Sequence, residues 1–208
     1  MKFKKLIINN LRQFKDINEI EFSTDSDKNI TVIYGGITYG KTTLLQAFNW
    51  VLYNQLNLQN PSQLLNLEVE DEMKPGESTS VSAELYLEKE DNDDDGNEYR
   101  FKRVQNYYTN LDGQVIPTSS FAIVEKKIND TWEKAGTFED EVNKILPQNL
   151  STYFFFDGER MDAISKEQRK GSQEVGNSVK SILGLEHFNT AIKHLKGSTG
   201  SRFSVISE

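Results

Sequence analysis

The chain has 208 residues, which suits one compact domain and is too short for two complete enzyme domains. Hydrophobic residues make up 36% of it and aromatic residues 11%, more aromatics than a disordered chain of this charge would carry. The formal net charge is −8, and −6 of that lies between Glu88 and Glu98, where seven acids and one lysine occur. An acidic balance of this kind argues against a protein that coats nucleic acid.

Two absences narrow the class of protein further. The sequence has no cysteine, which excludes disulfides, thiolate zinc sites and cysteine nucleophiles, and favours a reducing, cytoplasmic location. It also contains no apolar run of membrane-spanning length and no secretion signal. We therefore expect no membrane partner.

The first fifty residues combine strand patterns with a glycine-rich loop. Alternation of polar and apolar residues predicts strands over Lys2–Asn9 and Asn18–Phe22. Ile30–Tyr34 is a β-branched apolar run typical of a strand buried on both faces, so we expect it to be the central strand. It leads into the loop Gly35–Thr42, and apolar residues then recur at helical spacing over Leu44–Leu52. The predicted order is strand, loop, helix.

An antiparallel β portion is predicted next. Val81–Leu87 and Tyr99–Tyr107 alternate as strands do, and Asp91–Asn97 between them has the Asp, Asn and Gly residues of a hairpin turn. Phe121–Lys127 and the pair Thr131-Trp132 can add further strands. The acidic run is therefore expected at the tip of a hairpin, where a solvated charged turn is the simplest interpretation.

The remaining segments are expected to be helices and connections. Asn54–Glu77 is polar and interrupted by prolines, which predicts a surface excursion with one short helix near Ser62–Leu67. Phe138–Leu146 is amphipathic and stops at a proline, and Val179–Leu195 also has helical spacing. Residues 197–208 have the composition of a flexible tail, so we predict one domain over residues 1–196.

One motif carries chemistry. Gly35, Gly40, Lys41 and Thr42 match the pattern G-x-x-x-x-G-K-[ST], the phosphate-binding P-loop. Glycines let the backbone N–H groups turn toward a phosphate chain, and the N-terminus of the following helix adds partial positive charge. Lys41 is expected to reach the β- and γ-phosphates, and the Thr42 hydroxyl to ligate Mg²⁺.

The motif predicts ATP and Mg²⁺ as cofactors. The residues expected to surround the nucleotide are Gly35, Gly36, Ile37, Thr38, Tyr39, Gly40, Lys41, Thr42 and Thr43. Ile37 and Thr38 stand where many P-loops have an asparagine and a third glycine. A β-carbon at Thr38 narrows the conformations open to the loop, so turnover of ATP is less strongly predicted than its binding.

Three segments in order, Asn10–Phe14, the P-loop and Phe154–Arg160, resemble the N-terminal head segment of SMC-like ATPases over residues 1 to about 196. The resemblance is first to the DndD type, which serves DNA sulfur modification, and then to the SbcC type. It implies an α/β P-loop NTPase fold, the N-terminal lobe of an ABC-type head. Such a lobe has a mixed central sheet, an antiparallel β portion and a C-terminal helix that leads to a coiled coil.

The resemblance also assigns roles to single residues. Arg12 matches a basic residue that lies beside the nucleotide phosphates in the family. Asp157 stands where the family has its Q-loop glutamine, and a carboxylate there can reach Mg²⁺ directly or through water. We therefore expect Lys41 and Asp157 to be catalytic, with Thr42 and Asp157 as metal ligands. Val179–Leu195 is similar to the helix that enters the coiled coil.

The function implied by the resemblance is that of half an ATPase head. ATP and Mg²⁺ bring two heads together as a homodimer, hydrolysis separates them, and the motion acts on DNA. The partners implied are the C-terminal half of the same head, a second head, DNA, and other proteins of a DNA modification or phage defence complex. Because groups that polarise the attacking water belong to the C-terminal half, we expect this chain alone to hydrolyse ATP weakly or not at all.

Two other readings stay open. Phe154–Phe156 followed by Asp157 also fits a Walker B strand, which would make the chain a self-sufficient small NTPase or kinase. A third hypothesis is a nucleotide-binding interaction module that does not hydrolyse ATP. The basic residues considered as contacts for DNA are Lys2, Lys4, Lys5, Arg100, Lys102, Arg103, Lys166, Arg169 and Lys170.

Overall fold

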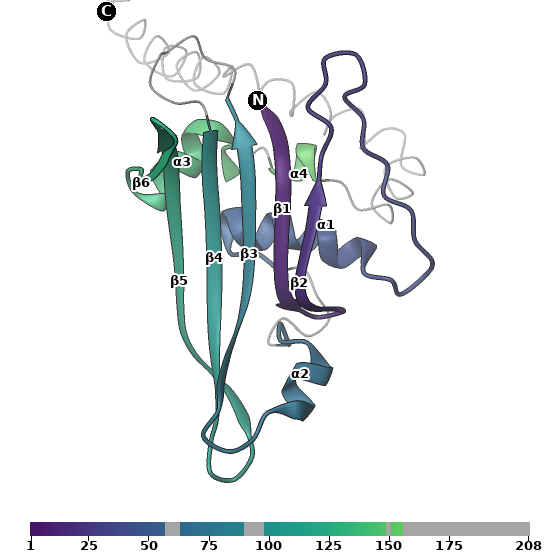
Figure 1. Cartoon of the computed structure of the whole chain (residues 1–208), viewed down its shortest axis with the longest axis vertical. Coiled ribbons are helices and arrows are strands. Elements are labelled where there is room, and N and C mark those ends of the chain that lie inside the picture. The colour runs from purple at the N-terminus through teal and green to yellow at the C-terminus, as the bar shows by residue number, and fades with distance from the viewer. Residues whose placement is uncertain (57–62, 90–97, 149–150, 156–208) are drawn as a thin grey trace, which may run out of the picture. The chain divides into compact units, whose positions relative to one another are not determined.

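The computed structural model describes residues 1–56, 63–89, 98–148 and 151–155 (Figure 1). The chain divides into two compact units, 1–148 and 149–208. Of the second unit only the single-turn helix α4 (Ser151–Phe154) and Phe155 are described. Asp157, the predicted helix Val179–Leu195 and the tail therefore lie outside the described residues, and the domain boundary at residue 196 stays a prediction.

The first unit is built on a six-stranded sheet in the order β2-β1-β3-β4-β5-β6. Its strands are β1 (Lys2–Leu11), β2 (Phe14–Glu21), β3 (Ser78–Glu88), β4 (Glu98–Thr109), β5 (Val115–Ile128) and β6 (Thr131–Lys134). All five neighbouring pairs are antiparallel. The predicted antiparallel portion is confirmed, but in the described part of the chain the expected mixed sheet is wrong, since no parallel pair occurs.

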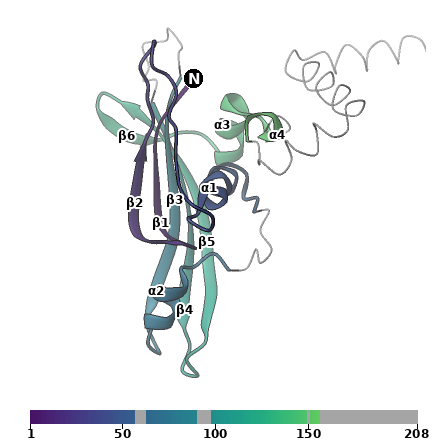
Figure 2. The same cartoon turned by 90° about the vertical axis from the view of Figure 1, so that its right-hand side faces the viewer.

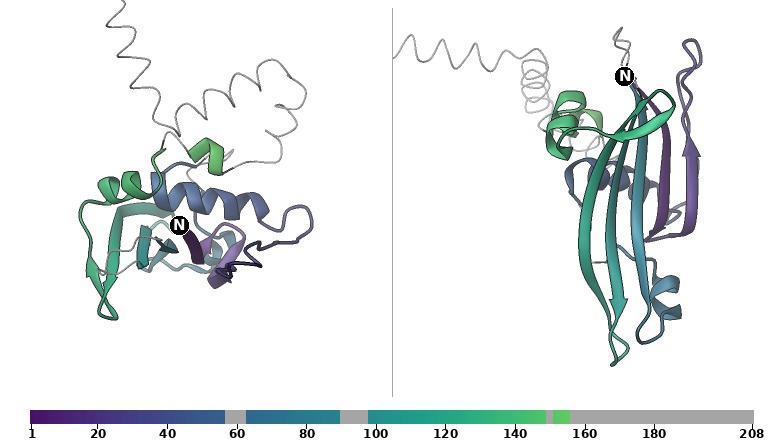
Figure 3. Two further views of the ribbon diagram at one scale, coloured as in Figure 1. Left: turned by 90° about the horizontal axis from the view of Figure 1, so that it is seen from above. Right: turned by 60° about the vertical axis from the view of Figure 1, so that its left-hand side comes forward.

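One face of the sheet forms the core. Leu6, Leu85, Phe101 and Val124 stand side by side across four strands, and each is at most 2% exposed. Because side chains alternate between the faces of a strand, every second residue of β3 from Val81 is buried in the same layer. Helices α1 (Lys41–Tyr53) and α3 (Phe138–Ile145) both lie over this face (Figures 2 and 3).

Side chains tie the C-terminal ends of these two helices to the rest of the unit. The last carbonyl groups of a helix lack partners within it. The Arg103 Nε donates a hydrogen bond of 3.3 Å to the Val51 carbonyl of α1, and the Tyr53 hydroxyl donates one of 3.0 Å to the Leu146 carbonyl. Burial raises the pKa of Tyr53, so this hydroxyl stays a donor.

Helix α3 confirms the prediction made for Phe138–Leu146, ending one residue earlier. The Thr137 hydroxyl accepts a hydrogen bond from the Asp140 N–H at its N-terminus, and three acids occupy the first turn. Both features stabilise the positive end of a helix. Phe138 then packs edge-on against Phe101 with ring centroids 5.6 Å apart, which joins the helix to the core.

The segment Ile30–Tyr34 contradicts its prediction. It forms no strand, and Ile30, Val32 and Tyr34 are 79%, 83% and 97% exposed. A β-branched apolar run becomes a buried strand only if neighbouring strands pair with it, and the six strands of the sheet pair with one another instead. The segment that leads into the P-loop therefore stands uncovered in the described structure.

The segment Asn54–Glu77 is more ordered than predicted. Its short helix, α2, spans Leu67–Glu72 and so begins where the prediction ended; Asn66 caps it by accepting from two backbone N–H groups. Leu64 and Leu65 before it are buried, and Leu65 bridges to Leu11 at the end of β1. The expectation of a purely surface excursion is therefore wrong for the described part of this segment.

The other face of the sheet carries ion pairs. Lys102 and Glu84 are 2.6 Å apart across β3 and β4, and Arg100 pairs with Glu125 of β5. Arg103 points to the opposite, helix-covered face, as its hydrogen bond to α1 requires. The basic residues of β4 therefore form no single patch. In the described ranges, no helix is long and apolar enough to cross a bilayer.

Candidate nucleotide-binding site

The N-terminus of α1 is open to an anion. The helix begins at Lys41 after Gly40, whose φ of 87° lies in the left-handed region that glycine tolerates. No side chain caps this end, and the first turn contains no acidic residue. The first intrahelical bond is donated by the Leu44 N–H, so the three N–H groups before it have no partner in the helix. Such an end attracts phosphate.

Lys41 lies in the loop that precedes its own helix. Its Nζ donates to the carbonyl oxygens of Gly35 and Gly36, at 2.7 and 2.5 Å. The loop is thus closed around the ammonium group that the motif reserves for phosphate. A bound phosphate chain must replace these two contacts, and phosphate oxygens are the stronger acceptors because they are charged.

The middle of the loop consists of three residues that lie between the glycines of the motif. Thr38 has a φ of 71°, which is strained for a β-branched residue. Tyr39 lies over Gly36, where an added β-carbon would meet the Tyr39 ring at 3.0 Å. Ile37 is exposed. The middle of the loop thus combines one strained residue with a close approach of the Tyr39 ring to Gly36.

The turn between β1 and β2 packs against this loop. The Thr43 hydroxyl donates a 2.6 Å hydrogen bond to Gln13 Oε1. A β-carbon on Gly40 would lie 2.9 Å from the ring of Phe14, which is closer than such atoms approach. Residues 30 positions apart in the sequence therefore meet at the start of α1, and the turn carries Arg12.

The backbone of Arg12 is held by hydrogen bonds, whereas one nitrogen of its side chain lacks a partner among the described residues. Its N–H donates to the Leu64 carbonyl at 2.8 Å, and its own carbonyl accepts from the Asn66 side chain. Its Nη1 is buried and, among the described residues, has no hydrogen-bond partner. A buried cationic donor without an acceptor is costly, so this atom suits an anionic ligand.

We expect the contact between turn and loop to contribute measurably to stability. Gln13→Ala and Thr43→Val each remove one partner of a half-buried hydrogen bond, and their effects should not add. Urea denaturation of both single variants and the double variant should give a coupling of about 1 kcal/mol. Additive effects would mean that the hydrogen bond is not formed in solution.

The metal ligands are only partly described. Thr42 is exposed at the start of α1, as a hydroxyl that binds Mg²⁺ must be, whereas Asp157 lies outside the described residues. Over the part of the chain that the structure describes, no group of three or more Asp, Glu or His side chains is arranged to hold a metal ion.

Two residues that contact the loop received no role in the sequence analysis. Gln13 follows Arg12 in the turn and contacts Thr43, and Phe14 begins β2 and lies against Gly40. Their adjacency to a residue already assigned to the phosphates was the signal that could have identified them. Of the predicted residues, the structure brings Gly35, Gly36 and Lys41 into direct contact.

Comparison with known proteins gives the family. The model of a family described as "AAA domain" matches residues 5–199. No curated protein matches the chain significantly. A solved structure described as "Structural biochemistry of ATP-driven dimerization and DNA stimulated activation of SMC ATPases" is 18% identical, with a TM-score of 0.51, and the match covers 84% of this chain and 99% of that one.

A second structure, the SMC head domain from Thermotoga maritima, is 20% identical over 69% of this chain and 42% of that one, with a TM-score of 0.37. At these identities the first likeness concerns the fold, and the second adds nothing to it. The family match spans most of the sequence and includes both the P-loop and the turn at Arg12. The chain accordingly belongs to the AAA domain family.

Proposed function

We propose that this chain is the N-terminal part of an SMC-like ATPase head and binds ATP with Mg²⁺ at the loop Gly35–Thr43. The observation that carries the proposal is the contact between the uncapped start of α1 and the turn that holds Arg12. We propose that the open helix N-terminus, Lys41 and the unpaired nitrogen of Arg12 on the neighbouring turn together bind several negative charges.

Each residue has a defined task in this proposal. The N–H groups of Lys41, Thr42 and Thr43 donate to phosphate oxygens, and the Lys41 ammonium neutralises the β- and γ-phosphates. Thr42 holds the metal ion, whose chemistry is to neutralise charge that develops on the transferred phosphate. Asp157 is the second proposed ligand and the proposed catalytic carboxylate.

In this proposal, a second polypeptide segment completes the head. The uncovered run Ile30–Tyr34 supports this, because three of its apolar side chains are more than three-quarters exposed next to the P-loop. Exposed β-branched residues with free backbone groups favour pairing with added strands. We propose that the C-terminal half of the same head supplies them, and that the finished head forms a homodimer around ATP.

The structure that this chain is similar to is described in terms of ATP-driven dimerisation and activation by DNA. We propose DNA as the partner here as well, with a role in DNA sulfur modification or phage defence. The ion pairs of the sheet leave β4 without a free basic surface, so DNA contacts are proposed for the finished head rather than for this sheet.

The site predicts a specific loss in one variant. Lys41→Ala should weaken binding of a fluorescent ATP analogue in Mg²⁺ by at least about tenfold, because a charge-assisted contact to phosphate contributes about 1.5–3 kcal/mol. Lys28→Ala removes an equal charge from an exposed position 13 residues earlier and should bind as the unaltered chain does. Equal affinity of both variants would remove the P-loop from the function.

Turnover separates the proposal from its rivals. Steady-state ATP hydrolysis should be close to background for this chain and should appear when the C-terminal half of the head is added. Robust hydrolysis by the chain alone would instead identify a self-sufficient NTPase with Asp157 as its Walker B carboxylate. A third outcome is that the chain binds no ATP, with or without the added half, and that Lys41→Ala behaves as the unaltered chain does. This outcome would identify an interaction module.

A further inference from the structure

The outer edge of β5 is only partly paired. β6 joins it over four residues, from Glu125 to Ile128. On the same side the Val124 carbonyl accepts a hydrogen bond from the Ala135 N–H. In an antiparallel strand alternate residues point both backbone groups to the same side, so Ala122 and Ser120 also present theirs outward. No described residue pairs with them on that side.

This open edge ends at a defined point on the N-terminal side of Ser120. The register between β4 and β5 shifts between Pro117 and Ser120, where β5 contains one residue more than β4. A proline and a bulge are devices that stop strands from pairing at an edge. The stretch Ser120–Val124 has neither, and it carries no charged side chain. Pairing is therefore prevented on one side of this stretch and left available within it.

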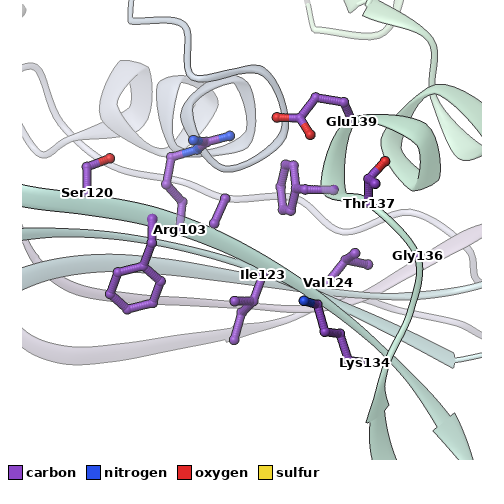
Figure 4. Close-up of a pocket in the computed structure, with 11 residues that line it drawn as sticks. Arg103, Ser120, Ile123, Val124, Lys134, Gly136, Thr137 and Glu139 are labelled. Atoms are coloured by element: carbon purple, nitrogen blue, oxygen red, sulfur yellow. The ribbon is translucent and has the colours of Figure 1, made fainter.

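A groove of about 380 Å³ runs along the open stretch (Figure 4). One wall is the β5 edge, and the other is the connection from Lys134 to Thr137 together with the start of α3. All of these residues belong to the first unit. The groove is therefore bounded by a strand edge on one side and a helix start on the other, a form that admits an extended chain.

Arg103 gives the groove its charge. The residue is only 9% exposed, and its guanidinium lies 5.1 Å from the centre of the Phe138 ring. Of its nitrogens only Nε has a hydrogen-bond partner among the described residues, the Val51 carbonyl. Burial lowers the pKa of Arg103, and the nearby charge of Glu139 opposes that effect. Four N–H donors on a buried cation are left for a ligand.

We propose that this groove binds an extended peptide segment of a partner protein, which pairs with Ser120 and Ala122 and places a carboxylate against Arg103. Pairing with the strand edge requires a ligand backbone with regularly spaced donors and acceptors, and a free phosphate has none. The planar guanidinium suits a carboxylate, and Lys134 at the rim adds attraction for acidic sequences. This binding is independent of ATP and would persist in Lys41→Ala.

A random library of linear 12-residue peptides displayed on phage, selected on the full chain, tests the proposal. The enriched peptides should share an acidic residue within an alternating β-branched run. A synthetic peptide of the enriched sequence should bind the chain in solution, and its Glu→Gln version should bind about tenfold more weakly. The two peptides should bind the Arg103→Gln variant with equal affinity.

The strand-pairing part has its own variant. Ala122→Pro removes one outward N–H, as Pro117 does naturally, and should weaken the peptide about tenfold or more. Ala122→Ser keeps the N–H and should bind as the unaltered chain does. Arg103→Lys keeps the positive charge but loses the Nε hydrogen bond to α1, as Arg103→Gln does. Comparison of the two variants therefore separates the effect of the charge from the effect of that contact. Circular dichroism and ATP-analogue binding establish that each variant is folded.

Two results overturn the proposal. One is a selection that enriches no peptide; the other is enriched peptides that bind Ala122→Pro and Arg103→Gln as tightly as the unaltered chain. Loss of ATP binding in Lys41→Ala with peptide binding retained leaves this inference intact and tests the nucleotide site alone. Failure of one function is thus distinguishable from failure of the other.

Discussion

Gly40→Ala should abolish detectable binding of a fluorescent ATP analogue and lower the free energy of unfolding by about 3 kcal/mol. Two costs combine at this position. A φ of 87° is unfavourable for alanine, and the new β-carbon would lie 2.9 Å from the Phe14 ring. Because Phe14 is the first residue of β2, next to the turn that carries Arg12, relief of the overlap should move this turn away from the phosphate loop. Urea denaturation and ligand titration measure the two effects.

Gly113 provides the matched control. It has a φ of 78° at the tip of the β4–β5 hairpin, and an added β-carbon there would meet nothing within 4 Å. Gly113→Ala should therefore cost only the conformational part, about 1 kcal/mol, and leave nucleotide binding unchanged. Similar losses in both variants would show that the contact with Phe14 does not exist in solution.

Phe101→Ala should be the most destabilising single substitution in the sheet, at about 3–5 kcal/mol. The side chain is fully buried at the centre of the row formed with Leu85 and Val124. It also makes an edge contact with Phe138 and a stacked one with Tyr99. Its removal leaves a cavity between the sheet and α3, and thermal or urea denaturation should record the loss.

Phe121 controls for the chemistry of that change. It stands on the next strand, opposite Val104, with 46% of its surface exposed. Phe121→Ala should cost about 1 kcal/mol or less, because only part of the ring leaves water on folding. If both substitutions cost the same, the buried layer assigned to Phe101 would be wrong.

The parts of the fold that follow from local pattern were predictable from the sequence. Val81–Leu87 alternates because one face of β3 is buried, and β3 contains that stretch. Phe138 starts an amphipathic helix because Thr137 caps it and acids follow. These features depend on neighbours in sequence, so no knowledge of the rest of the chain was needed.

Features that depend on distant partners were not predictable. Ile30–Tyr34 has the composition of a central strand, yet composition does not say whether a partner strand is present in the chain. Likewise the motif located Lys41 and Thr42, but only the fold reveals that Gln13 packs against Thr43 and Phe14 against Gly40. The loop sequence alone contains no information about that contact.

The closure of the loop on Lys41 has a consequence for measured affinity. As long as the Lys41 Nζ is held by the carbonyls of Gly35 and Gly36, the loop is in a closed state that does not bind phosphate. The apparent dissociation constant for ATP is then the intrinsic constant divided by the fraction of molecules with an open loop. Each 1.4 kcal/mol by which closure is favoured weakens apparent binding about tenfold. A second polypeptide that holds the loop open would thus raise ATP affinity without touching the nucleotide.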